Sequence, residues 1–96
     1  MRHKPFQFLS RGKTLFAQRW WPDVYPKAVV VFVHTWAGHS GRDAQLAEQL
    51  TAQGYACYGF DFQGHGQSQG RKGYIADFNH WVLDLTTFIE VVHSEL

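Results

Sequence analysis

Apolar and polar positions along the first 33 residues follow patterns that predict strands. Residues Phe6–Ser10 form a short strand candidate, and Thr14–Trp21 is a second one, rich in β-branched and aromatic side chains. The turn residues Arg11-Gly12-Lys13 between them predict an antiparallel hairpin. Ala28–Val33 is an uninterrupted apolar run of strand length, which is typical of a strand that is buried on both faces within a parallel sheet.

The next segment has the periodicity of an amphipathic helix. A helix is predicted over Arg42–Gln53, followed by a strand over Tyr55–Phe60. The expected apolar face of this helix is Leu46, Ala47 and Leu50, with Ser40 as its N-cap and Gly54 as its C-cap. Strand, helix and strand therefore form one βαβ unit, which is expected to be right-handed.

A second helix is predicted over Asp77–Val92, after a glycine-rich loop at Phe62–Gly73. Its expected apolar stripe is Phe78, Val82, Leu85, Ile89 and Val92, with Asp77 as a possible cap. The stripe should pack against the sheet.

Composition limits the classes of protein to consider. The chain has 96 residues, 17% of them aromatic and 18% charged, with a net charge of +1. These values fit one small globular domain, and the absence of a basic stripe argues against nucleic-acid binding. No apolar run approaches the roughly 18–20 residues of a membrane span, and no secretory signal opens the chain. With the single Cys57, which cannot form an internal disulfide, this predicts a soluble cytoplasmic protein.

Two serine motifs resemble a catalytic nucleophile elbow and fail its structural requirements. Gly66-Gln67-Ser68-Gln69-Gly70 matches G-x-S-x-G, but an elbow needs a strand leading directly into it and a helix leaving it. Polar and glycine residues flank this match on both sides. Gly38-His39-Ser40-Gly41-Arg42 lacks the final glycine. The six histidines include no i,i+4 pair, so no metal or other cofactor is expected.

The loop His34–Gly41 lies between a predicted buried strand and a predicted helix. Free backbone N–H groups near a helix N-terminus suit an anion or a developing oxyanion. A tight strand-to-helix turn without any ligand explains the same residues, and on these residues alone it is the simpler interpretation.

The two loops together resemble the monoacylglycerol lipase/lysophospholipase group of α/β-hydrolases, often labelled serine aminopeptidase S33. The matching positions are His34, Gly38-His39-Ser40-Gly41-Arg42, Gly54-Tyr55, Asp61-x-x-Gly64-His65-Gly66-x-Ser68-x-Gly70, Phe78 and Asp84. The resemblance covers nearly the whole chain, from about Phe6 to Leu96. Ser68 matches a loop serine of the family and not its nucleophile.

The resemblance implies an α/β class protein, with residues 1–96 as an incomplete α/β-hydrolase domain. An antiparallel hairpin would lead into a mostly parallel sheet with flanking helices, truncated before the nucleophile elbow. Trp36 would supply one oxyanion-hole N–H from its backbone, although the family usually has Gly where Thr35 and Ala37 stand. The nucleophile, acid and base would all lie beyond Leu96, so the chain alone is expected to lack catalysis.

In its complete form the implied activity is hydrolysis of carboxylic esters such as monoacylglycerols or lysophospholipids. Two alternatives stay open: a non-catalytic lipid- or protein-binding module, and a fragment with no separate function. By the same resemblance, Ala28–Val33 becomes an uncharged sheet edge in this chain. A complementing chain, or self-association through that edge, is therefore expected.

Overall fold

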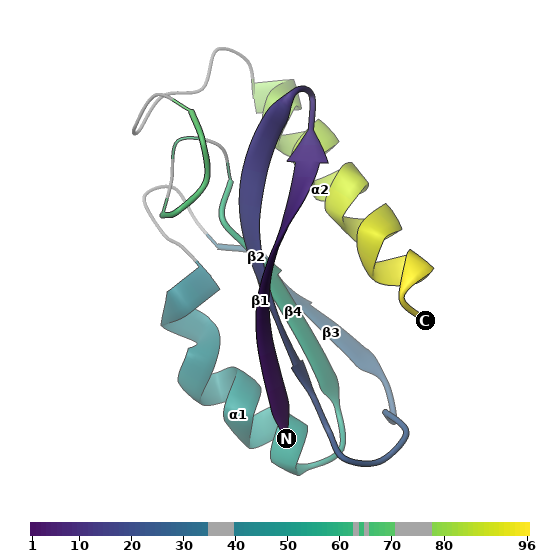
Figure 1. Cartoon of the computed structure of the whole chain (residues 1–96). Helices are drawn as coiled ribbons and strands as arrows, with labels where there is room; N and C mark the ends of the chain where they lie inside the picture. The colour runs from purple at the N-terminus through teal and green to yellow at the C-terminus, as the bar shows by residue number, and fades with distance from the viewer. Residues whose placement is uncertain (35–39, 63, 65, 71–77) are drawn as a thin grey trace.

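A four-stranded sheet with one helix on each face forms the protein (Figure 1). The computed structural model describes residues 1–34, 40–62, 64, 66–70 and 78–96. The strands are β1 (Arg2–Ser10), β2 (Lys13–Trp21), β3 (Val29–Phe32) and β4 (Ala56–Phe60); a 3-10 turn (Ser40–Asp43) precedes α1 (Ala44–Ala52), and α2 is Phe78–Ser94. No helix in the described part of the chain is long and apolar enough to cross a membrane.

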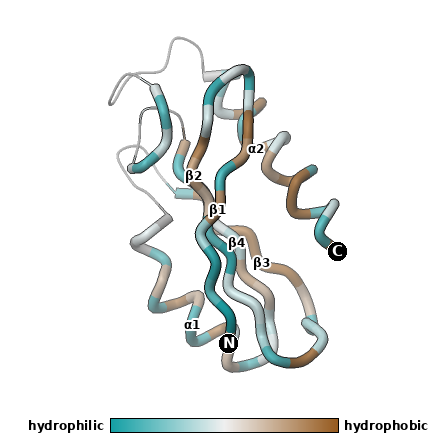
Figure 2. The backbone as a smooth tube through the Cα atoms, viewed as in Figure 1, coloured by the Kyte–Doolittle hydropathy of each residue, from teal (hydrophilic) through white to brown (hydrophobic). Residues whose placement is uncertain are grey.

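The predicted hairpin is confirmed, and it is longer than the pattern indicated. β1 pairs antiparallel with β2 from Arg2 opposite Trp21 to Ser10 opposite Lys13. The first residues of β1 are hydrophilic (Figure 2), so they carry no apolar alternation that would have revealed a strand. Pro5 is tolerated because β1 lies at the edge of the sheet.

The strand order β1-β2-β4-β3 confirms the α/β class and the predicted βαβ unit. β2 pairs antiparallel with β4, and β3 pairs parallel with β4. α1 connects these two parallel strands and packs on one face, where Trp20, Ala47 and Cys57 form a small buried cluster. Trp20 is buried, whereas the next residue, Trp21, is partly buried and packs against the core on the opposite face.

The opposite face of the sheet carries the larger core, which α2 covers. Its buried aromatic residues are Phe8, Tyr58, Phe60, Phe62 and Phe88. The rings of Phe8 and Phe60 both lie against Phe88, with centroids 5.3 and 4.6 Å away. Because α2 contributes Phe88 from its middle, this one side chain joins the helix to two strands, β1 and β4.

The predicted apolar stripe of α2 is wrong in part. Val82 and Ile89 are 47% and 50% exposed, whereas Phe88 and Val92 are buried. Asp84 also lies on the buried face, where Ser10 Oγ donates a 2.6 Å hydrogen bond to its Oδ1. Because Asp84 is charged, the hydropathy pattern did not indicate that its side of α2 is the buried face. The side chain of Phe78, and the whole of Asp77, lie outside the described residues.

Three smaller expectations on α1 and β3 are also corrected. The N-cap of α1 is Asp43 and not Ser40, because a 3-10 turn precedes the helix. Leu46 is 49% exposed, and Thr51 takes its place on the buried face. β3 is only half-buried, since it is paired with β4 alone and leaves its other side open in the described part of the chain.

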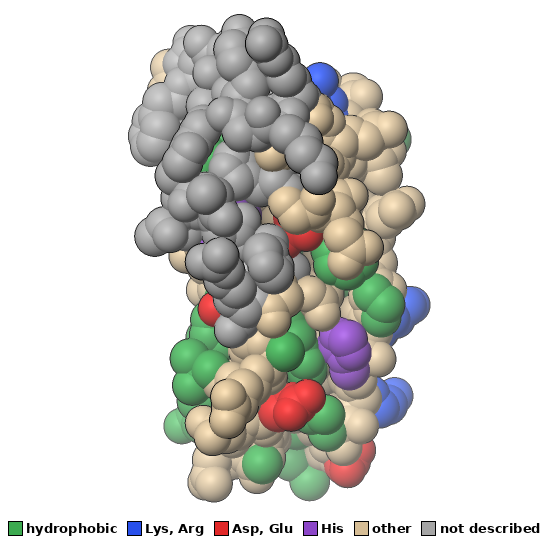
Figure 3. Space-filling view, turned by 90° about the vertical axis from the view of Figure 1, so that its left-hand side faces the viewer, with side chains coloured by type: hydrophobic (Ala, Val, Ile, Leu, Met, Phe, Trp, Pro, Cys, Tyr) green, Lys and Arg blue, Asp and Glu red, His purple; other side chains and the backbone are tan. Residues whose placement is uncertain are grey.

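The end of α1 follows the glycine prediction. Gly54 has φ +96° and stands just beyond the C-cap, where its N–H donates to Thr51 O and the Tyr55 N–H donates to Leu50 O. These two bonds form a Schellman motif, which favours glycine at this position. On the outer side of α1, polar and apolar side chains are mixed, as the lower half of Figure 3 shows.

Replacing Gly54 with Ala should destabilise the protein by about 1 kcal/mol, because the Cβ of Ala is sterically strained at a positive φ that Gly adopts freely. A Cβ would also lie 3.2 Å from Lys27 Cε, a flexible neighbour that adds little to this cost. Urea unfolding measures the difference. Gly12→Ala is a matched control for the φ penalty alone, because nothing lies within 4 Å of the added atom there. A cost at Gly54 well below that at Gly12 would contradict the capping role.

Candidate functional site

The carboxyl ends of β3 and β4 lie side by side because these strands are parallel neighbours. His34 follows β3, and Asp61 and Phe62 follow β4. The Phe62 N–H donates a 3.0 Å hydrogen bond to His34 Nε2. Since Nε2 accepts this bond, the ring proton of neutral His34 is on Nδ1. This contact fixes the start of the loop after β3 against the loop after β4.

An aromatic group connects this edge to α2. The Phe62 ring stacks on Trp81 with centroids 4.4 Å apart, and His34 meets Phe62 edge-on at 4.8 Å. A hollow of about 130 Å³ adjoins these rings, lined by Val33, His34, Phe62, Trp81, Val82 and Leu85. Its lining is almost entirely apolar, so it suits a hydrocarbon group better than a polar ligand.

The loop after β4 is fastened to β2 by its backbone and by one hydroxyl. The Asp61 N–H donates to Phe16 O at 2.8 Å, and the Phe16 N–H donates to Ser68 Oγ at 2.8 Å. The Ser68 hydroxyl donates in turn to Asp61 O. These three bonds extend the pairing of β2 past the end of β4 and hold the loop closed.

Two glutamines complete this closure. Thr14 and Gln69 are joined twice, since the Gln69 N–H donates to Thr14 O at 3.0 Å and the Thr14 N–H donates to Gln69 Oε1 at 2.8 Å. The Gln67 N–H donates to Asp61 Oδ2 at 2.9 Å. Asp61 is only 2% exposed, so its carboxylate accepts a hydrogen bond from the loop backbone and has little contact with solvent.

The geometry of Ser68 agrees with the interpretation that it is not a nucleophile. A nucleophilic serine needs a base that takes its proton, and a backbone carbonyl cannot serve as one. The only thiol, Cys57, is buried, and burial raises its pKa. Neither group is placed to attack a substrate.

Replacing Ser68 with Ala should lower the free energy of unfolding by about 1–3 kcal/mol, because the Phe16 N–H and the Asp61 carbonyl both lose a partner. Denaturant titration measures this loss. Ser94→Ala is the matched control, since the Ser94 hydroxyl is exposed and bonds only to its own helix. Equal losses for the two variants would show that Ser68 does not fasten the loop.

The remaining predicted site residue cannot be placed. Trp36, the expected backbone donor to an oxyanion, lies outside the described residues, so its role stays a prediction. The described residues contain no group of three or more His, Cys, Asp or Glu side chains that could hold a metal ion.

Sequence reasoning missed the contacts that hold the site to the rest of the fold. It did not predict the Phe62–Trp81 stack or the buried Ser10–Asp84 pair. One signal was available: Trp81, Asp84 and Phe88 are spaced three and four residues apart, which places them on one face of a helix.

Comparison with known proteins identifies the relatives of this arrangement. A family model described as serine aminopeptidase, S33, matches residues 25–96. The chain is 34% identical over 76 residues to a monoacylglycerol lipase of Mycolicibacterium smegmatis, which covers 79% of this chain and 27% of that protein. It is 44% identical over 59 residues to protein K6 of vaccinia virus (strain Western Reserve), which covers 62% of this chain and 73% of that protein.

The fold has close counterparts among solved structures. A soluble variant of monoglyceride lipase from Saccharomyces cerevisiae has a TM-score of 0.83 with this chain at 23% sequence identity. The match covers 94% of this chain and 30% of that one. At this identity the likeness shows the fold alone. The chain spans less than a third of the length of the monoacylglycerol lipases it matches.

Proposed function

Since the chain belongs to the serine aminopeptidase S33 family of α/β-hydrolases, we propose that it forms the oxyanion-binding part of a carboxylic ester hydrolase. The observation that carries this proposal is the family match over the whole βαβ unit, including the loop after β3. The hydrogen bond between His34 and Phe62 supports it, because this bond fixes the residue from which that loop departs.

The proposed chemical role belongs to the backbone of Trp36. When a nucleophile attacks an ester carbonyl, negative charge develops on the carbonyl oxygen. A fixed N–H directed at that oxygen stabilises the transition state without reorganisation. The nucleophile, the general base and its acid partner are then supplied by polypeptide outside these 96 residues. On its own the chain is expected to hydrolyse no ester, because oxyanion stabilisation without attack produces no reaction.

The proposed substrates are single-chain esters such as monoacylglycerols or lysophospholipids. Relatives named as monoacylglycerol lipases support this class. The apolar hollow beside His34 and Trp81 supports it as well, since it offers space for a hydrocarbon group at the proposed catalytic end of the sheet.

We further propose that the open side of β3 receives the strand that carries the nucleophile. β3 is apolar, and Val33 at its end is 53% exposed. An apolar edge strand, with one side unpaired in the described part of the chain, is a template for backbone pairing. The partner is either a complementing chain or, less completely, a second copy of this one. The single buried cysteine supports a reducing, cytoplasmic location.

A hybrid enzyme tests the proposed function. In it, residues 1–96 replace the matching segment of the Mycolicibacterium smegmatis monoacylglycerol lipase, and hydrolysis of a monoacylglycerol is measured. The proposal predicts measurable hydrolysis that exceeds that of the lipase lacking its matching segment. A folded but inactive hybrid would contradict it. The isolated chain, treated with a fluorophosphonate, should remain unlabelled, and labelling that disappears in Ser68→Ala would overturn the assignment of Ser68.

A further inference from the structure

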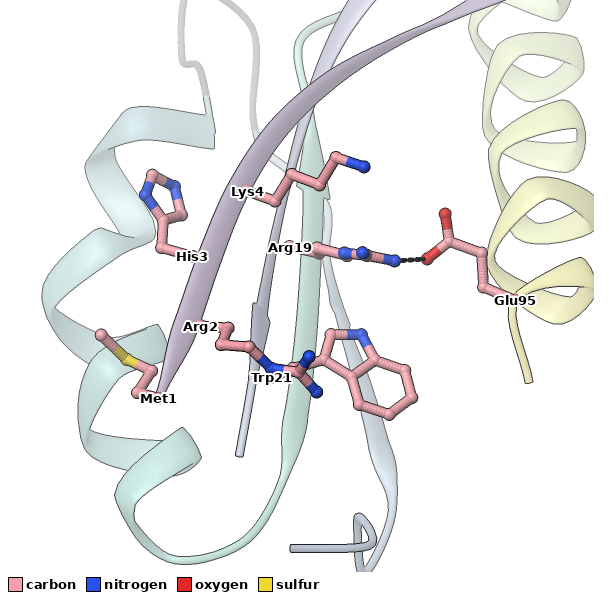
Figure 4. A pocket seen from close by; sticks show the side chains of 7 residues that line it. All are labelled: Met1, Arg2, His3, Lys4, Arg19, Trp21 and Glu95. Carbon is pink, nitrogen blue, oxygen red and sulfur yellow. Dashed lines mark hydrogen bonds and ion pairs between the residues drawn. The ribbon is translucent and has the colours of Figure 1, made fainter. Parts of the chain in front are cut away.

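A second hollow lies at the other end of the sheet from His34 and Phe62. It has a volume of about 780 Å³ and is lined chiefly by Arg2, Lys4, Arg19, Trp21 and Glu95 (Figure 4). Arg2 pairs with Trp21 and Lys4 with Arg19 in the β1–β2 register. Directly opposed residues point to the same face of a sheet, so all four side chains share the face that α2 covers.

The wall of this hollow is fixed by a chain of hydrogen bonds. Trp21 Nε1 donates to Tyr58 Oη at 2.9 Å, and Tyr58 Oη donates to Glu95 Oε1 at 2.8 Å. Arg19 donates to the same Glu95 oxygen at 2.6 Å. Burial, with the bond to Glu95, raises the pKa of Tyr58 to about 12, so its hydroxyl stays protonated. The wall is therefore preformed, and the charge of Glu95 is balanced by Arg19.

The mouth of the hollow carries uncompensated positive charge. Arg2 and Lys4 form no ion pair within the described residues. Two acidic side chains lie in this region, and both are already paired: Glu95 with Arg19, and Asp23 with the Met1 ammonium at 2.9 Å. The Met1 ammonium is the main cause that lowers the pKa of Asp23, and the charge of Arg2 lowers this pKa to a smaller extent. The side chains of Arg2 and Lys4 on β1 are therefore available to bind an anionic ligand.

An apolar hollow adjoins the basic one. It has a volume of about 300 Å³ and shares Trp21 and Glu95 with its neighbour. Its other lining residues are Tyr25, Pro26, Val29 and Leu96. Tyr25 and Leu96 are 93% and 63% exposed, which leaves apolar surface in contact with water. A basic compartment and an apolar compartment therefore meet at the indole of Trp21.

We propose that these joined hollows bind a single-chain anionic amphiphile, with its head group between Arg2 and Lys4 and its hydrocarbon chain along Trp21, Tyr25 and Val29. A small anion would interact only with the basic hollow, and a neutral lipid only with the apolar hollow. The site shares no residue with the hollow at His34. Its Val29 belongs to β3, the strand proposed to receive the nucleophile strand, so binding is tested on the chain without a complementing polypeptide.

Titration of the ¹⁵N-labelled chain with decanoate tests this site, using acetate and neutral decyl maltoside as comparison ligands. Decanoate should move the backbone signals of Arg2 and Lys4 and the indole signal of Trp21. Acetate should bind at least about tenfold more weakly, because it lacks the chain. Lys4→Gln should weaken decanoate binding about threefold, and the Arg2→Gln/Lys4→Gln double variant about tenfold, as expected for exposed charges.

Lys13→Gln is the matched control, because Lys13 lies at the opposite end of the same hairpin. It should bind decanoate as the unaltered chain does. Three results would each overturn the proposal: equal weakening in Lys4→Gln and Lys13→Gln, equal affinity for decanoate and decyl maltoside, or signal changes confined to His34, Phe62 and Trp81. The same spectra report whether each variant is folded.

Discussion

Replacing Trp36 with Pro in the hybrid enzyme is expected to lower kcat about 10²–10³-fold. Removing one oxyanion-hole donor typically has an effect of this size, and proline has no N–H to donate. In the proposed function the lipase part of the hybrid supplies the nucleophile, the base and the acid, so the substitution leaves them unchanged. The rate of monoacylglycerol hydrolysis at saturating substrate measures the loss.

Trp36→Phe is the control for this prediction. It keeps the backbone N–H and an aromatic side chain, so kcat should fall by less than about tenfold, and any change should appear mainly in KM. If Phe and Pro lower kcat equally, the side chain and not the backbone of residue 36 carries the effect. If neither changes kcat, the oxyanion donor is a different group.

Phe88→Ala should destabilise the fold by about 3–5 kcal/mol. Phe88 is fully buried, and its ring contacts those of Phe8, Tyr58 and Phe60. Removing the ring leaves a cavity at the point where α2 joins the sheet. A domain of this size has a total stability of roughly 5–15 kcal/mol, so the variant should unfold at much lower denaturant concentration. Urea unfolding followed by circular dichroism measures the change.

The adjacent residue provides a matched control. Ile89 is 50% exposed, so Ile89→Ala should cost less than about 1 kcal/mol. The two substitutions also decide between two faces of α2, because the hydropathy pattern favoured Ile89 and the structure buries Phe88. A larger loss at Ile89 would show that the pattern was right and the helix orientation wrong.

The strands and helices could be predicted from the sequence because their signals are local. The apolar run of β3, the hairpin turn at Gly12 and the glycine after α1 each act within a few residues. The buried face of α2 could not be predicted in this way. Asp84 lies on it with two partners from a distant part of the chain: Ser10, 74 positions earlier, donates a hydrogen bond to its Oδ1, and Arg11 Nε lies 3.4 Å from the same oxygen. A buried polar residue is acceptable when it has such a partner, and hydropathy does not report partners.

The sequence predicted the family to which the candidate site belongs, but it did not predict the contacts that hold the site together. The glycine loop Gly64-His65-Gly66-x-Ser68-x-Gly70, together with the helix start His39-Ser40-Gly41-Arg42 at this spacing, indicated the α/β-hydrolase group. That Ser68 fastens the loop to Phe16, and that His34 accepts a bond from Phe62, depends on β2 and β3 flanking the same strand. Such contacts join segments that only the folded sheet brings together.

In the proposed function this chain supplies the oxyanion side of a hydrolase, and the strand that carries the nucleophile pairs with β3. The most direct measurement is complementation in trans: the 96-residue chain is mixed with the Mycolicibacterium smegmatis lipase from which the matching segment has been removed, and monoacylglycerol hydrolysis is followed. We expect hydrolysis to rise with chain concentration, to saturate, and to be lost with Trp36→Pro. An active covalent hybrid combined with no gain in trans would contradict docking at β3, and an inactive hybrid would contradict the catalytic role itself.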